Sequence, residues 1–158
     1  MPGKRLEEYE GAMTMPDINY QAVFEAFPGP TALLSCDFTI LDANGDYLAA
    51  VGRERADVIG QNIFTAFPTN SREPSNTGQD NLRASLESVV ATGEMDRMEL
   101  IRLDIEVPGK PGVFDERYWA VVNSPVLGQS GRPDLIVHRA ADATATVRQV
   151  LQSQAVSG

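Results

Sequence analysis

The sequence has few of the residues that bind metals or act as nucleophiles. Its 158 residues include one cysteine, Cys36, and one histidine, His138. A single cysteine excludes an internal disulfide, and these two residues do not make a thiolate or histidine-rich metal site. A Cys36–His138 nucleophile pair stays conceivable, because the two side chains need only meet in space. Both lie in predicted strands, however, and no third residue is evident to orient the base. We therefore expect no catalytic residue and no metal.

Long apolar runs and an excess of positive charge are also missing. No apolar run approaches the roughly 20 residues that a membrane-spanning helix needs, and the first ten residues lack the apolar segment of a signal peptide. Thirteen Lys and Arg stand against 22 Asp and Glu, which gives a net charge of −9. Because phosphates and anionic lipids attract positive charge, we expect no nucleic-acid partner and no membrane contact. We also expect a cytoplasmic location.

The first part of the chain predicts an arm and a helix. Residues 1–16 are polar and predict a partly ordered N-terminal arm. In residues 17–28, large apolar side chains recur at helical spacing, which predicts a flanking helix capped by Asp17. These side chains are Tyr20, Val23, Phe24 and Phe27. Since they form a single stripe, they are also the predicted contact surface of a homodimer.

Strand-like runs stand on both sides of a helical middle. Apolar runs at residues 31–36 and 38–43 predict a hairpin, and runs at 95–107, 114–126 and 133–141 predict three more strands. Between them lie short helical segments at 44–52, 55–59 and 62–67, a polar loop at 69–79 and a longer helix at 80–92, and a last helix follows at 143–156. A parallel sheet would need alternating strands and helices, so this grouping predicts an α+β fold with helices over one face of an antiparallel sheet.

Short motifs follow one another through the chain at regular places. They are ILDAN at residues 40–44 with Tyr47 and Leu48, then Gly52, VIGQ at 58–61, RYW at 117–119, NSPV at 123–126, Gly131 and ADAT at 141–144. In this order and spacing they resemble a PAS domain, a sensor module common in bacterial signalling proteins, and most closely those linked to histidine kinases. The resemblance runs from about residue 20 to residue 144, nearly the whole chain.

The resemblance implies a particular fold and a C-terminal helix that transmits the signal. It implies a PAS core at residues 29–144, with five antiparallel strands in the order 2-1-5-4-3 and a helical cup over one face. In the family, the last strand ends in an Asp-X-Thr turn that leads into a signalling helix. Asp142 and Thr144 match that turn, and residues 145–158 match the start of the helix.

The family binds flavin or haem through particular residues, and this sequence can be compared with them position by position. Flavin photosensors of the family carry a reactive cysteine directly after a Gly-X-Asn step, and here Ile63 follows that step. Haem-binding relatives usually supply a histidine from the longer helix, and residues 80–92 contain none. We therefore expect no cofactor, with haem held unusually by His138, or an unidentified small molecule, as the alternatives.

Alternation along the strands indicates which side chains face the space under the cup. Aligned to the family's pocket, the predicted ligand-binding residues are Leu33, Ser35, Phe64, Trp119, Val121, Asn123, Ile136, His138 and Ala140. The polar groups among them either form hydrogen bonds with one another and with nearby backbone or contact a small polar ligand. Arg117 lies at the rim, where it binds an anion or pairs with Asp104 or Glu99. Cys36 is expected to face away from this pocket, beneath a flanking helix.

The predicted function is a non-enzymatic sensory and dimerisation module of a bacterial signalling protein. No phosphate-binding loop, paired histidines or nucleophile elbow is present. A small ligand between sheet and helices is the expected signal, and a kinase or other regulator, in the same or another chain, is the expected output. The alternative is a stand-alone small-molecule carrier or a small α+β enzyme.

Overall fold

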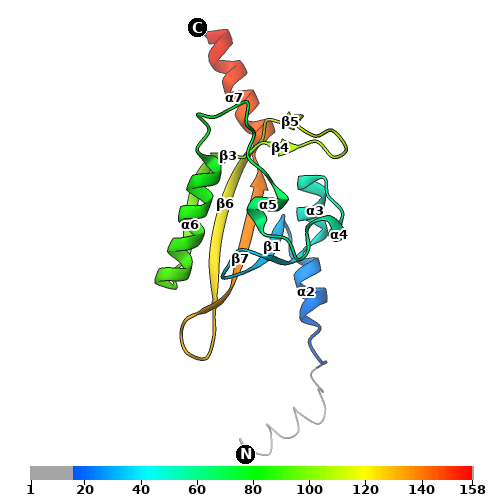
Figure 1. The fold of residues 1–158 in the computed structure, drawn as a ribbon, viewed down its shortest axis with the longest axis vertical. Helices are drawn as coiled ribbons and strands as arrows, with labels where there is room; N and C mark the ends of the chain where they lie inside the picture. Colours follow the sequence, from blue (N-terminus) through cyan, green and yellow to red (C-terminus); the bar gives the residue numbers. More distant parts are fainter. Residues whose placement is uncertain (1–15, 158) are drawn as a thin grey trace, which may run out of the picture.

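A computed structural model describes residues 16–157 of the chain. The predicted N-terminal arm, apart from its last residue, lies outside the described residues. The elements are α2 (Tyr20–Ala26), β1 (Thr31–Ser35), β2 (Ile40–Ala43), α3 (Gly45–Val51), α4 (Arg55–Val58), α5 (Ile63–Ala66), α6 (Gly78–Thr92), β3 (Asp96–Arg102), β4 (Ile105–Glu106), β5 (Phe114–Asp115), β6 (Tyr118–Leu127), β7 (Pro133–Asp142) and α7 (Thr144–Ser157). Figure 1 shows α2 and α7 at opposite ends of the long axis.

The main sheet confirms the predicted strand order. Its five strands run β2-β1-β7-β6-β3, and every neighbouring pair is antiparallel. Because β6 and β7 are the fourth and fifth strands of this sheet in chain order, the arrangement is 2-1-5-4-3. Helices α3 to α6 lie over one face of this sheet (Figure 1). The fold is therefore α+β, as expected.

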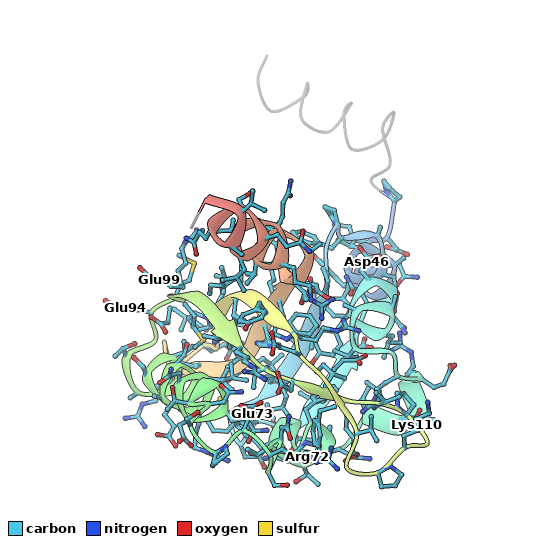
Figure 2. The ribbon with its side chains drawn as sticks, turned by 90° about the horizontal axis from the view of Figure 1, so that it is seen from above. Asp46, Arg72, Glu73, Glu94, Glu99 and Lys110 are labelled. Atoms are coloured by element: carbon cyan, nitrogen blue, oxygen red, sulfur yellow. The ribbon has the colours of Figure 1, made fainter. Side chains whose placement is uncertain are left out.

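Two of the predicted strands are shorter than expected. The runs at 95–107 and 114–126 each break, and their inner ends pair with each other as the small sheet β4–β5. The break lies at Leu103, whose N–H donates to the Arg117 carbonyl and whose carbonyl accepts from the Trp119 indole. These bonds hold the chain at the sheet edge while the β4–β5 hairpin leaves it. Figure 2 shows Lys110 at the far end of that hairpin.

Helix α2 begins later than the sequence predicts. Asn19, not Asp17, is its N-cap, and the Asn19 side chain accepts from the Ala22 N–H at 3.1 Å. No residue of α2 is buried. The helix is held to the core mainly by polar contacts, since Glu25 pairs with Arg55 and accepts from the Gly45 N–H at the start of α3.

Asn44 joins the segment after α2 to the first helix of the cup. It is fully buried, and its side-chain oxygen accepts from the N–H groups of Tyr47 and Thr31 at 2.9 and 3.0 Å. Its amide nitrogen donates to the carbonyls of Phe27 and Gly29. One side chain therefore caps α3, as the sequence predicts, and also satisfies three backbone groups of the incoming chain.

The core lies between the inner face of the sheet and the helices. Leu34, Ile136 and Val121 cover it from the strands, and Leu86 and Val89 of α6 from the other side. Helix α6 begins at Gly78, where its backbone packs directly on the end of β3. A Cβ atom there would lie 1.8 Å from the Arg102 carbonyl oxygen. Within residues 16–157, no helix has the length and apolar character to cross a bilayer.

Candidate functional site

A cavity of about 40 Å³ lies between the inner face of the sheet and the helices. It has room for a few water molecules. Its walls are Tyr47, Val51, Ile63, Phe64, Phe67, Gln79, Leu82, Leu103, Asp104, Ile105, Trp119, Val121, His138 and Ala140. Most of these side chains are apolar or aromatic, with a few polar groups among them, which is the usual composition of a small-molecule site.

Most of the predicted ligand-binding residues lie in or beside this cavity. Five of them are in its wall, namely Phe64, Trp119, Val121, His138 and Ala140. Asn123 and Ile136 are fully buried on the same inner face, outside the wall itself. The strand alternation inferred for β6 and β7 is therefore the observed one.

The placement of Leu33 and Ser35 in the pocket was wrong. Leu33 lies opposite Val137 and Leu34 lies opposite Ile136, and directly opposed residues share a face. Ala32 and Leu34 are therefore the residues of β1 that point into the core, and both have an exposed fraction of 0%. The sequence does not settle this phase, because two adjacent leucines fit either alternation.

His138 is held by a chain of hydrogen bonds from α6. Its Nδ1 lies 2.7 Å from the Asn123 side-chain oxygen, and the Asn123 amide nitrogen donates to Ser85 Oγ at 2.9 Å. Burial lowers the pKa of His138 to about 4 from an ordinary 6.5, so the ring is neutral near pH 7. Asn123 therefore forms its hydrogen bonds with His138 and Ser85. This agrees with the first alternative from the sequence, in which the polar groups of the inner face pair with one another. The role of Ser85 was not predicted.

The acidic corner of the cavity is neutralised within the protein. Arg102 donates from Nε and Nη2 to the two oxygens of Asp104, at 2.9 and 3.0 Å, and Asn70 adds a third bond. Burial raises the pKa of Asp104, but these hydrogen bonds outweigh it and bring the pKa below the ordinary value. The carboxylate thus contributes no unpaired charge to the cavity.

Arg117 has other partners than those expected. It pairs with neither Asp104 nor Glu99. Its Nη1 donates to Asp142 Oδ2 at 2.8 Å and to the Ala50 carbonyl of α3 at 3.3 Å. The register of β6 and β7 explains the partner, since their paired ends bring Arg117 beside Asp142.

The turn into α7 is closed by the two predicted signal-transfer residues. Asp142 Oδ1 accepts from the Thr144 N–H at 2.9 Å, and Thr144 Oγ1 accepts from the Tyr118 N–H at 3.0 Å. Burial raises the pKa of Asp142, but the bonds from Thr144 and Arg117 outweigh it and lower the pKa below its ordinary value. The end of β7 and the start of α7 are therefore fixed to the start of β6.

The other singled-out residues lie away from the cavity. Cys36 is half-buried and donates to the Pro133 carbonyl at 3.3 Å, so the Cys36–His138 pair does not form. Burial, with Asp134 and Asp37 nearby, raises the pKa of its thiol. In the predicted dimer stripe on α2, the exposed fractions of Tyr20, Val23 and Phe27 are 74%, 52% and 47%, and Phe24 is half-buried.

The sheet, the cup of helices and the capped exit turn define an α+β sensor-type module. A family model described as the PAS fold matches residues 24–148. The chain therefore belongs to the PAS family. No curated protein sequence matches it closely enough to serve as a relative.

Solved structures share this fold at low sequence identity. An RNA-binding light-oxygen-voltage receptor matches 87% of this chain with 18% identity and a TM-score of 0.63. A PAS domain from Colwellia psychrerythraea matches 80% with 13% identity, 95% of its own length and a TM-score of 0.61. A sensory box sensor histidine kinase structure from Vibrio cholerae matches 85% with 15% identity, 97% of its own length and a TM-score of 0.52. The chain spans 36% of the RNA-binding receptor, so it matches one part of that protein.

Proposed function

We propose that this chain is a non-enzymatic sensory and dimerisation module of a bacterial signal-transduction protein. A small ligand binds in the cavity between the sheet and the helices. The change passes through the exit turn to α7, and from there to a kinase or other regulator in the same or another chain. We place this module in the cytoplasm, and the acidic net charge of −9 supports the absence of contact with nucleic acid or anionic membrane.

The observation that carries this proposal is a continuous path from the cavity wall to α7. Helix α3 supplies Tyr47 and Val51 to the wall, and its Ala50 carbonyl accepts from Arg117. The same Arg117 nitrogen donates to Asp142, which in turn accepts from the Thr144 N–H. A displacement of α3 by a ligand therefore reaches the first residue of α7 through three hydrogen bonds.

We propose that the cavity takes a small organic molecule in preference to flavin or haem. Ile63, at the place of the reactive cysteine of flavin photosensors, has an exposed fraction of 3% and forms part of the wall. An isoleucine side chain cannot form the covalent adduct that a reactive cysteine forms with a flavin. A cavity of about 40 Å³ is also far smaller than a porphyrin. Absorption spectra of purified protein, without a flavin or haem band, are the expected result.

The dimer proposal rests on the exposed side chains of α2. Tyr20 and Val23 are large, apolar and open to solvent on one face of α2, and Phe27 follows as the C-cap of that helix, with Arg139 5.4 Å from the centre of its ring. A twofold interface uses the same patch on both copies, so one stripe is sufficient for a homodimer.

The proposal is tested by following ligand binding and α7 together. The ¹⁵N-labelled chain is titrated with toluene, phenol and indole, and backbone amide shifts are recorded. We expect at least one compound to shift Tyr47, Trp119 and Thr144. In an Arg117→Met variant, the Tyr47 shift remains and the Thr144 shift shrinks. Shifts confined to residues outside the cavity contradict the ligand site. Shifts in the cavity without any at Thr144 favour the carrier alternative.

A further inference from the structure

One of the two ring nitrogens of His138, Nδ1, forms a hydrogen bond within the protein. On the other side of Asn123, the amide nitrogen lies 2.9 Å from Ser85 Oγ, which can donate or accept, and 3.9 Å from Met98 Sδ, which only accepts and therefore suits the amide nitrogen. The Asn123 oxygen therefore faces His138, and because a carbonyl oxygen only accepts, Nδ1 carries the hydrogen. In a neutral ring, Nε2 is then an acceptor with an unshared electron pair.

That acceptor opens onto the cavity. Among residues 16–157, every fully enclosed side-chain nitrogen or oxygen has a hydrogen-bond partner. His138 Nε2 has no partner in the same part of the chain, so it is not fully enclosed. The residue has an exposed fraction of 3% and forms part of the cavity wall, which leaves the cavity as the space that Nε2 meets.

Tyr47 stands beside it. The two rings meet edge to face with centroids 6.1 Å apart, and both residues are in the cavity wall. Tyr47 is buried, and burial raises the pKa of its hydroxyl, so the group stays neutral. Its hydroxyl has no hydrogen bond to another described residue. The cavity therefore presents an acceptor nitrogen and a neutral hydroxyl from neighbouring side chains.

The other polar groups of the wall are already in use. The Trp119 indole donates to the Leu103 carbonyl, and Asp104 is paired with Arg102. Gln79 donates to the Phe67 carbonyl and accepts from Thr69. A charged ligand would meet no unpaired opposite charge here, and burying an unpaired charge is costly.

We propose that the ligand of this cavity is a small, uncharged ring compound whose N–H or O–H group donates to His138 Nε2, with the Tyr47 hydroxyl as the second contact. This inference rests on the proposed function, since it specifies the ligand of the same site. The cavity of about 40 Å³ is below the roughly 150 Å³ that holds a benzene ring. The smallest aromatic rings are therefore the suitable probes, and the wall must open to admit them, with Phe64 and Phe67 as its half-buried aromatic residues.

The first measurement is the state of the ring itself. Because the chain has a single histidine, the side-chain nitrogen signals of a ¹⁵N-histidine-labelled sample belong to His138 alone. We expect a neutral ring with hydrogen on Nδ1 at pH 7. A ring with hydrogen on Nε2, or a charged ring, overturns the inference.

The second measurement compares pyrrole with furan. The two rings have nearly the same size, and pyrrole carries an N–H donor where furan has none. We expect pyrrole to bind about five- to tenfold more tightly, the effect of one neutral hydrogen bond, and to shift the His138 Nε2 signal. In a His138→Phe variant this preference disappears. The comparison on the unmodified protein stands even where a variant fails to fold.

The outcomes separate the inference from the proposed function. Equal binding of both rings, with shifts at Tyr47 and Trp119 but none at His138 Nε2, overturns the inference and leaves the cavity as a ligand site. Binding of neither ring, in a sample whose amide spectrum shows a folded protein, contradicts the inference and the ligand site together.

Discussion

Single polar side chains help to fix how the helices of this protein meet its sheet. Asn44 joins the segment before β1 to α3, His138 is linked through Asn123 to α6, and Arg117 joins α3 to the end of β7. Each is buried or half-buried, so the loss of its partners leaves backbone or side-chain groups without hydrogen bonds in places where water is scarce. Substitutions at these positions are therefore expected to cost more than equal changes on the surface.

Asn44→Ala is expected to lower the free energy of unfolding by about 2–4 kcal/mol. The substitution removes a helix cap, which is typically worth about 1 kcal/mol, and leaves buried backbone groups unpaired at about 1–3 kcal/mol each. Urea unfolding measures the change. The matched control is Asn19→Ala, which removes an exposed cap with one bond and is expected to cost about 1 kcal/mol or less. Equal losses in the two variants contradict this account of Asn44.

His138 makes stability depend on pH between about 4 and 6.5. Burial lowers its pKa in the folded protein, so as pH falls below 6.5 the unfolded chain takes up the proton first and stability is lost until about pH 4. The shift from 6.5 to about 4 corresponds to roughly 3 kcal/mol. Above pH 6.5 His138 contributes nothing to the pH dependence of the free energy of unfolding. Urea unfolding across this range measures the effect, and the slope is expected to be smaller in His138→Phe, where the group is absent. An unchanged slope contradicts the lowered pKa.

At the scale of elements, α6 is positioned by the absence of a side chain at its first residue. Gly78→Ala is expected to destabilise the fold by about 1–3 kcal/mol or more, because the new Cβ meets the backbone of β3 and one of the two elements must shift. Gly45→Ala at the start of α3 is the control, since a Cβ there meets nothing within 4 Å. It is expected to be neutral or slightly stabilising. Thermal unfolding distinguishes the two, and a tolerated Gly78→Ala contradicts the close approach.

Elements with a clear period were predictable from the sequence, and those fixed by distant contacts were not. Helix α3 with its Asn44 cap and the body of α6 follow from local signals, and the sheet order follows from the family resemblance. The phase of β1 does not, because Leu33 and Leu34 are equally apolar. The break after β3 depends on bonds from Leu103 to Arg117 and Trp119, which no local pattern contains.

The same limit applies to the candidate site. The inward faces of β6 and β7 were predicted from strand alternation together with alignment to the family's pocket, and Trp119, Val121 and His138 do lie in the cavity wall. The hydrogen bonding of Asn123 was not predictable, since it depends on Ser85, a residue of α6 that is 38 positions away in the chain. Arg117 likewise takes a partner that only the strand register brings near it.

At the scale of the whole molecule, assembly is expected to depend on α2. The double variant Tyr20→Glu with Val23→Glu places two negative charges on the exposed stripe, and we expect it to be a monomer by analytical ultracentrifugation. Because both residues are more than half exposed, the fold itself is expected to persist. Gln21→Glu with Ala22→Glu adds the same charge outside the stripe and is expected to remain a dimer. An unsubstituted chain that sediments as a monomer at about 100 µM, well above a micromolar Kd, contradicts the dimer.

The single tryptophan gives the whole molecule one optical signal. Trp119 is the only indole in the chain, it forms part of the cavity wall, and its exposed fraction is 3%. Its intrinsic fluorescence therefore arises from one place, screened from collisional quenchers such as iodide. A compound that enters the cavity touches the fluorophore directly, and one that binds elsewhere does not. Emission wavelength and quenching thus distinguish occupancy of this cavity from binding at the surface in unlabelled protein.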